Sequence, residues 1–153
     1  MKREPMDFSR LSETIKAKEL VGKKVMSDTG KEIGKVNAVH LDKESLAMAG
    51  IEVDRGLLEV DSFIGKDYIS SIGNEGIFLN ITPVSEYKGA KVLDADGHNV
   101  GHVKEVQRVG ATNQLESIVI DRGLGKGDLV VARNDIQVFG DRIILGHRVK
   151  SVD

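Results

Sequence analysis

The triplet Asp28-Thr29-Gly30 has the sequence that aspartic proteases use for catalysis. That chemistry needs two carboxylates that share one proton. A second triplet stands 67 residues further along the chain, but it reads Ala95-Asp96-Gly97, so alanine occupies the place of the second catalytic aspartate. We therefore interpret the first triplet as a hairpin turn and predict no protease activity.

A calcium loop is the second chemistry that the residues suggest. Asp94, Asp96 and Glu105 fall at positions 1, 3 and 12 of a loop of the EF-hand kind. That loop needs glycine at position 6 for its sharp turn, and this chain has Asn99 there. No helical pattern flanks the segment, so we interpret it as a turn between strands and predict no calcium site.

The glycine-rich segment Gly123–Gly127 follows a predicted strand, as a phosphate-binding loop does. Such a loop must lead into a helix whose N-terminus faces the anion. Here Asp128–Val131 follows, and it reads as another strand. The other copy of the repeat described below has Leu57 and Leu58 in the equivalent segment. We therefore expect a flexible loop between strands and no nucleotide site.

The four histidines give no convincing metal site. His98 and His102 are four residues apart, which places them on one face of a strand, while His40 and His147 stand alone. No partner carboxylate can be assigned from the sequence. The chain contains no cysteine, so thiolate metal sites, Cys nucleophiles and disulfides are excluded. We predict no catalytic residues, no metal and no cofactor, and hence a protein that is not an enzyme.

The elements that position these residues form an internal repeat. The 153-residue chain aligns with itself at a constant offset of 67 residues without a gap. The longest identity is Asp-Arg-Gly-Leu, which occurs as Asp54-Arg55-Gly56-Leu57 and as Asp121-Arg122-Gly123-Leu124. We interpret Asp54, Arg55 and Gly56, with Asp121, Arg122 and Gly123, as a structural motif, an Asp–Arg pair or a capped turn at a strand end. The alternative is a pair of equivalent charged contact sites.

The repeat divides the chain into a charged N-terminal extension, residues 1–18, and two domains, residues 19–82 and 83–153. Pro83 marks the junction, because its fixed φ and missing N–H suit a boundary. We expect a helix only around Ser12–Leu20, in an extension that the second copy lacks.

Within each copy, short β-branched runs predict five or six strands, and a sheet this small is expected to curl into a barrel. Asp96-Gly97 predicts a type I′ hairpin turn, and Thr29-Gly30 takes its place in the first copy. Valines at a spacing of three around Gly101, and the equivalent Gly34, predict a bulge there. The fold class is therefore all-β.

Two stretches of the first copy, Ala17–Val25 and Asp28–Val36, with the same order repeated from Gly89 to Leu145, resemble the PRC-barrel family. The resemblance implies two tandem small PRC-type β-barrels that act as a protein-binding scaffold. The tandem form is similar to archaeal cell-division adaptors of the CdpB type. Those imply SepF of the FtsZ ring, or a second PRC-barrel protein, as the partner. The same domain occurs in a ribosome maturation factor, which implies an RNA- or ribosome-associated module as the alternative.

Composition bears on these alternatives. The net charge is −2, no continuous basic run occurs, and only four Phe and two Tyr are available for stacking, so nucleic-acid binding is not favoured. No apolar stretch is long enough to span a bilayer, and the first 20 residues lack a secretory apolar core. We expect a cytoplasmic protein that reaches the division site at the membrane through its partner.

Candidate partner-binding residues come from two segments. Apolar side chains stand among charges in the N-terminal extension, where a short helix could dock in a groove. In the first copy, the apolar residues Leu57 and Leu58 stand at positions that belong to the glycine-rich loop in the second copy. The candidates are Met6, Phe8, Leu11, Ile15, Leu57 and Leu58. Exposed sheet edges also predict a homodimer.

Overall fold

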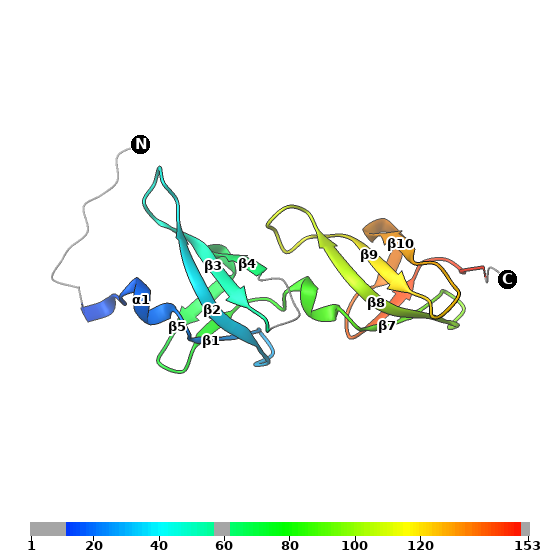
Figure 1. Ribbon diagram of the computed structural model, residues 1–153, viewed down its shortest axis with the longest axis horizontal. Helices are drawn as coiled ribbons and strands as arrows, with labels where there is room; N and C mark the ends of the chain where they lie inside the picture. Colours follow the sequence, from blue (N-terminus) through cyan, green and yellow to red (C-terminus); the bar gives the residue numbers. More distant parts are fainter. Residues whose placement is uncertain (1–11, 57–61, 151–153) are drawn as a thin grey trace. The chain divides into compact units, whose positions relative to one another are not determined.

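The computed structural model describes residues 12–56 and 62–150 of the chain. These residues form two compact units, divided between Ile81 and Thr82 (Figure 1). Each unit contains one six-stranded sheet, and the strand order is the same in both. The all-β prediction is therefore confirmed.

The first unit begins with the one-turn helix α1, which precedes a sheet of strand order β4-β3-β2-β1-β6-β5. Its neighbours are antiparallel except β1 and β6, which are parallel. The end strands β4 and β5 are connected by the 3₁₀ turn η2. The elements are α1 (Ala17–Leu20), β1 (Lys24–Met26), β2 (Glu32–Leu41), β3 (Met48–Asp54), β4 (Ser62–Gly65), η2 (Lys66–Tyr68), β5 (Ile69–Ile72) and β6 (Ile77–Leu79).

The second unit repeats this arrangement in the order β10-β9-β8-β7-β12-β11, again with one parallel pair, β7 and β12. The 3₁₀ turn η3 stands where α1 stands in the first unit. The elements are η3 (Val84–Tyr87), β7 (Lys91–Leu93), β8 (Asn99–Arg108), β9 (Leu115–Asp121), β10 (Leu129–Ala132), η4 (Arg133–Asp135), β11 (Ile136–Val138) and β12 (Arg142–Leu145).

Each sheet packs its own aliphatic core. In β3, Ile51 and Val53 are buried, and in β9 the equivalent Ile118 and Ile120 are fully buried. The alternation arises because successive side chains of a strand point to opposite faces of the sheet. The two copies therefore bury equivalent positions, which explains why a constant sequence offset could reveal the fold.

The bulge predicted beside Gly34 and Gly101 is confirmed. Val25 pairs with Gly34 and Met26 with Glu32, so one residue of β2 has no counterpart on β1. The second unit shows the same shift, with Val92 opposite Gly101. A side chain at Gly101 would collide with the backbone carbonyl of Asp121, so the bulge brings two strands into close backbone contact.

The predicted type I′ turn is wrong. That turn needs positive φ at both central residues, but of the predicted central pairs only Gly30 and Gly97 have it, while Thr29 and Asp96 do not. The Gly30 N–H instead donates to the Ser27 carbonyl at 3.0 Å, and Gly30 itself has φ of 84°. This is the three-residue hairpin loop that ends on a left-handed glycine. The second copy has the same loop, with Gly97 at φ of 85°.

The helix predicted over Ser12–Leu20 is also wrong in extent. Only Ala17–Leu20 is α-helical, and no side chain caps its start. A four-residue helix has too few internal hydrogen bonds to propagate further without such a cap. Its equivalent in the second copy is Val84–Tyr87, which forms a 3₁₀ turn, so this single turn belongs to the repeat.

Candidate functional site

Two adjoining hollows lie on the second unit. The larger has a volume of about 650 Å³ and the smaller about 370 Å³. Both are lined by Arg122 and Lys126 of the β9–β10 loop and by Asn99 and Val100 at the start of β8. We call the two together the basic hollow. Its lining comes from separate segments of the chain, so it exists only in the folded unit.

Cationic side chains dominate the lining of the larger hollow. Arg122 and Lys126 come from the β9–β10 loop, and Arg148 and Lys150 come from the segment after β12. Asp94 is the carboxylate that lines it. The whole chain has a net charge of −2, so this local excess of positive charge is a property of the site and not of the protein surface in general. Such a site attracts anions.

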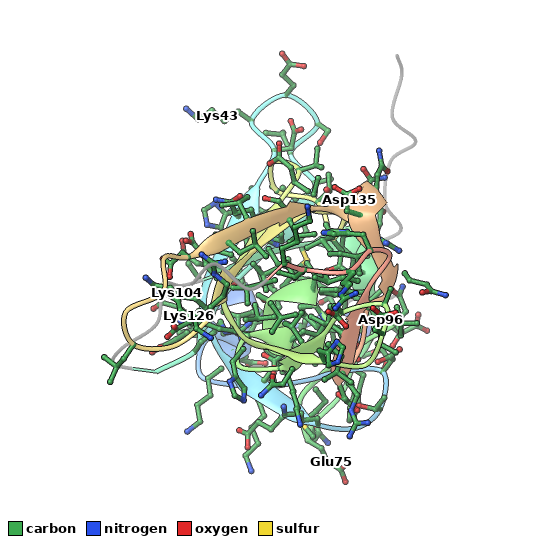
Figure 2. All side chains as sticks on the ribbon, turned by 90° about the vertical axis from the view of Figure 1, so that its right-hand side faces the viewer. Lys43, Glu75, Asp96, Lys104, Lys126 and Asp135 are labelled. Atoms are coloured by element: carbon green, nitrogen blue, oxygen red, sulfur yellow. The ribbon has the colours of Figure 1, made fainter. Side chains whose placement is uncertain are left out.

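Hydrogen bonds hold the β9–β10 loop in place. The Arg122 Nε donates to the Gly127 carbonyl at 2.6 Å, and the Lys126 N–H donates to the Gly123 carbonyl at 3.2 Å. Beyond the loop, Lys104 Nζ bonds the Asp128 carboxylate at 2.8 Å, and this hydrogen bond raises the pKa of Lys104. The loop therefore presents Arg122 in a defined orientation. Figure 2 shows Lys126 and Lys104 on the same side of the second unit.

Asp94 is buried and its carboxylate serves the hairpin loop between β7 and β8. Its Oδ1 accepts from the N–H groups of Asp96 and His98, and its Oδ2 accepts from the Val149 N–H at 3.4 Å. Burial alone would raise the pKa of Asp94, but the backbone donors and the nearby His98 outweigh it and hold the pKa below its ordinary value. Asp94 is thus held in its ionised form, with two donors from its own loop and one from the segment after β12.

A second ion pair borders the hollow. Arg148 Nε lies 3.5 Å from the Asp96 carboxylate, with both side chains largely exposed. An exposed pair of this kind contributes little to stability and exchanges partners readily. Arg148 therefore lies beside the hollow, and its guanidinium group can exchange the Asp96 carboxylate for another anion.

The first copy does not repeat these cations in its sequence. Of the positions equivalent to the four cations only Arg55 is also basic, while Lys31 stands at the position equivalent to His98. Lys126 corresponds to Glu59, Arg148 to Ile81 and Lys150 to Pro83. Because both copies have the same fold, the fold does not require these cations, and their presence in the second copy calls for another explanation.

A different surface distinguishes the first copy. The hairpin of β2 and β3 ends in residues 42–47, and the neighbouring Leu41 and Leu46 are 63% and 64% exposed. Leu46 has φ of 63°, and no other non-glycine residue in the described ranges has positive φ. This conformation costs a bulky side chain about 1–2 kcal/mol. We call Leu41 and Leu46 the hairpin leucines.

The partner-binding candidates named from the sequence are only partly placed. Met6, Phe8 and Leu11, and likewise Leu57 and Leu58, lie outside the described residues. Ile15 lies before α1 and is 37% exposed. Ile15 is therefore the one candidate that the described part of the chain contains.

The Asp-Arg-Gly motif closes a turn at a strand end in both copies. The Gly56 N–H donates to Asp54 Oδ1 at 2.9 Å, and the Gly123 N–H donates to Asp121 Oδ1 at the same distance. The two glycines have φ of 114° and 106°. In the second copy the arginine of the motif, Arg122, also lines the basic hollow. This position therefore belongs both to the turn motif and to the candidate site.

The described residues contain no group of three or more His, Asp or Glu side chains that could hold a metal ion. Asp28 and Asp94, which the protease and calcium patterns would use, both belong to hairpin loops. In residues 12–56 and 62–150, no helix is long and apolar enough to cross a membrane.

Sequence reasoning missed both the basic hollow and the hairpin leucines. The hollow depends on residues after β12 folding beside the β9–β10 loop, which no local pattern indicates. One signal was present, because Glu59 and Lys126 differ in charge at equivalent positions. The hairpin had a signal as well, since Leu46 replaces the turn-forming Asn113 of the second copy.

Comparison with known families gives one result. The profile of the PRC-barrel domain matches residues 12–83 and matches again over residues 80–146. The two matches follow the two units of the structure. Domains of this family are protein-interaction modules that are generally not catalytic. No curated protein matches the chain.

Proposed function

The chain belongs to the PRC-barrel domain family, and we propose that it is a non-enzymatic adaptor that binds another protein through the hairpin leucines of its first copy. The N-terminal residues Met6, Phe8, Leu11 and Ile15 are proposed as a further contact. Leu57 and Leu58 are proposed as a third contact.

The observation that carries this proposal is the conformation of Leu46. A bulky residue with positive φ is unfavourable, and its exposed side chain does not contribute to the core of the free protein. Gly or Asn would fit this backbone better. A residue that costs stability, on the same hairpin as the exposed Leu41, fits a surface that gains its energy on binding a partner.

We further propose that the partner belongs to an archaeal cell-division complex, with SepF linking the chain to the FtsZ-based machinery. The support is the tandem two-copy arrangement, which resembles adaptors of that system. The proposed localisation follows from it, namely recruitment from the cytoplasm to the division site through the partner.

Binding of purified SepF to the full chain, measured by biolayer interferometry, tests this assignment. We expect saturable binding that the double substitution Leu41→Ser and Leu46→Asn weakens at least about tenfold, since anchors of this kind contribute more than 1 kcal/mol each. The matched control is Val109→Ser, which changes an exposed apolar side chain at the equivalent hairpin of the second copy. Equal loss in both variants would contradict a site on the first copy.

The alternative is an RNA- or ribosome-associated module. The basic hollow favours this alternative, since clustered Arg and Lys attract phosphate groups. Filter binding of ribosomal RNA at 50 mM and 200 mM salt would distinguish it, because phosphate contacts make affinity fall steeply with salt. Salt-sensitive RNA binding without any affinity for SepF would replace the adaptor proposal.

Self-association, or pairing with a second PRC-barrel protein, is proposed for the sheet ends. Val130 on β10 and Val138 on β11 are 64% and 45% exposed, and both strands end the second sheet. An end strand with exposed apolar side chains is a template for pairing. Light scattering of the purified chain should give the mass of a dimer, and Val130→Lys should shift it to the monomer mass of 16.7 kDa.

A further inference from the structure

We propose that the basic hollow of the second unit binds a small phosphorylated anion carrying a di- or triphosphate group. This site is separate from the hairpin leucines and does not depend on the adaptor role. Its ligand class follows from the charge, the shape and the fixed orientation of the residues around the hollow.

Charge converges on the hollow from two segments of the chain. The β9–β10 loop supplies Arg122 and Lys126, and the segment after β12 supplies Arg148 and Lys150. A compact anion with several charges can contact more of these side chains at once than a single carboxylate can.

Arg122 is oriented before any ligand arrives. Its Nε is bound to the Gly127 carbonyl, so the guanidinium plane is fixed against the loop while the residue lines both parts of the hollow. The planar donor pattern of arginine matches the oxygens of a phosphoryl group. Because the side chain is already ordered, binding costs less side-chain entropy than it would for a mobile arginine.

Two carboxylates line the basic hollow, Asp94 in the larger part and Asp121 in the smaller, and Asp121 Oδ1 already accepts from the Gly123 N–H. Asp94 is nearly fully buried and accepts three backbone hydrogen bonds, two from its own loop and one from the Val149 N–H. Asp96 is paired with Arg148 at 3.5 Å across an exposed contact. An incoming anion with higher charge would compete for Arg148, since exposed pairs are weak.

The loop chemistry permits a close approach. Gly123, Gly125 and Gly127 alternate along the β9–β10 loop, and a Cβ added at Gly123 or Gly125 would meet no neighbouring atom within 4 Å. Gly123 lines the smaller hollow, so an anion can approach the loop closely there, while the Gly123 N–H stays bonded to Asp121 Oδ1.

The volume of the hollow and the comparison with the first copy distinguish this site from an ordinary basic surface. A volume of about 650 Å³ lies within the range of small-molecule sites, about 300–1,000 Å³. The first copy, with the same fold, has Glu59, Ile81 and Pro83 in place of three of the four cations. The cations are therefore an addition to the second copy, which fits a ligand site and not a requirement of the fold.

Titration of the isotope-labelled full chain with sodium pyrophosphate and, separately, with ATP tests the proposal by NMR. We expect amide shifts confined to the β7–β8 loop, the β9–β10 loop and residues 147–150. The double variant Arg122→Gln and Lys126→Gln should weaken binding about tenfold or more, since it removes two charged donors from the hollow. The single variant Lys126→Gln, at an exposed side chain, gives the same test without altering the loop bond of Arg122.

The matched control carries the same loss of charge in the first copy, as Arg55→Gln and Lys35→Gln, and it should bind like the unmodified chain. Binding of both probes supports a shared phosphate site, and binding of ATP alone supports a nucleotide site. The proposal is overturned if neither probe produces local shifts at millimolar concentration, or if the copy-one control weakens binding as much as Arg122→Gln and Lys126→Gln. It is also overturned if a hexaglutamate peptide binds the same residues more tightly than pyrophosphate, which would indicate docking of an acidic protein segment.

Discussion

Leu46 and Asn113 occupy the same position of the two hairpins, yet they are used in opposite ways. The Asn113 amide accepts from the Val84 N–H at 2.9 Å and donates to the Thr82 carbonyl at 3.4 Å. It thereby ties the β8–β9 hairpin to the start of η3. Leu46 instead extends into solvent on a left-handed backbone. The same fold therefore ties one hairpin to its own unit and carries an exposed leucine on the other; Figure 1 shows the two hairpins, between β2 and β3 and between β8 and β9.

Leu46→Asn should stabilise the first unit by about 1 kcal/mol, because Asn tolerates positive φ better than Leu. Urea unfolding followed by NMR of the β2 and β3 amides measures the change. The same variant should bind the partner less tightly, so stability and binding move in opposite directions. A destabilised variant would show that Leu46 packs in the folded unit, and would remove the argument for a binding role.

Asn113→Leu makes the reciprocal change in the second copy. It removes two hydrogen bonds and leaves the Val84 N–H and the Thr82 carbonyl without this partner, so we expect a loss of about 1–3 kcal/mol. Hydrogen exchange should become faster at Val84, whose N–H is the donor. If hydrogen exchange at Val84 did not change, water would have replaced the Asn113 amide without a loss of stability.

The sequence predicted most of the fold because the fold is repeated. A run such as Asp54-Arg55-Gly56 carries little information alone, but its recurrence at Asp121 fixes the alignment of both copies. The alternating buried positions at Ile51 and Val53 then identify the strands. The turn type was not predictable in the same way, because an Asp-Gly pair suits both a type I′ turn and a loop that ends on a left-handed glycine.

The candidate site was predicted far less well, for a physical reason. Arg148 follows the last strand and Arg122 follows β9, and only the folded sheet brings them to one hollow. Periodicity reports which face of a strand is buried, but not which loops meet at its end. Leu46 escaped notice because φ is a property of the backbone, and a hairpin of this length accepts several turn residues.

Gly101→Ala tests the bulge that both copies share. Gly101 has φ of 149°, and a Cβ there would collide with the Asp121 carbonyl, so overpacking adds to backbone strain. We expect the second unit to lose more than about 3 kcal/mol of stability. Gly97→Ala is the control, since φ is 85° but no atom lies within 4 Å of the added Cβ. It should cost about 1–2 kcal/mol. Equal losses would show that strain, and not the strand contact, governs this position.

Asp94→Asn should reveal a pH-dependent contribution to the stability of the second unit. The folded-state pKa of Asp94 lies below its ordinary value of 3.8, because backbone N–H donors favour the ionised form despite burial. A lowered pKa stabilises the folded state fully above the unfolded-state pKa, and this stabilisation disappears as the pH falls through the folded-state value. The variant should therefore be less stable than the unmodified chain at pH 7, and the difference should shrink as the pH falls below 3.8.

The first copy supplies the control for this pH dependence. Ser27 stands at the position equivalent to Asp94, is likewise buried, and its Oγ accepts from the Thr29 and Lys31 N–H groups at 3.3 Å. A hydroxyl does not titrate in this range, so Ser27→Ala should destabilise the first unit by the same amount at pH 7 and at pH 3. Urea unfolding monitored at the amides of β1 and β7 reports the two units separately. A loss for Asp94→Asn that is equally independent of pH would mean that the hydrogen bonds of Asp94, and not its charge, stabilise the loop.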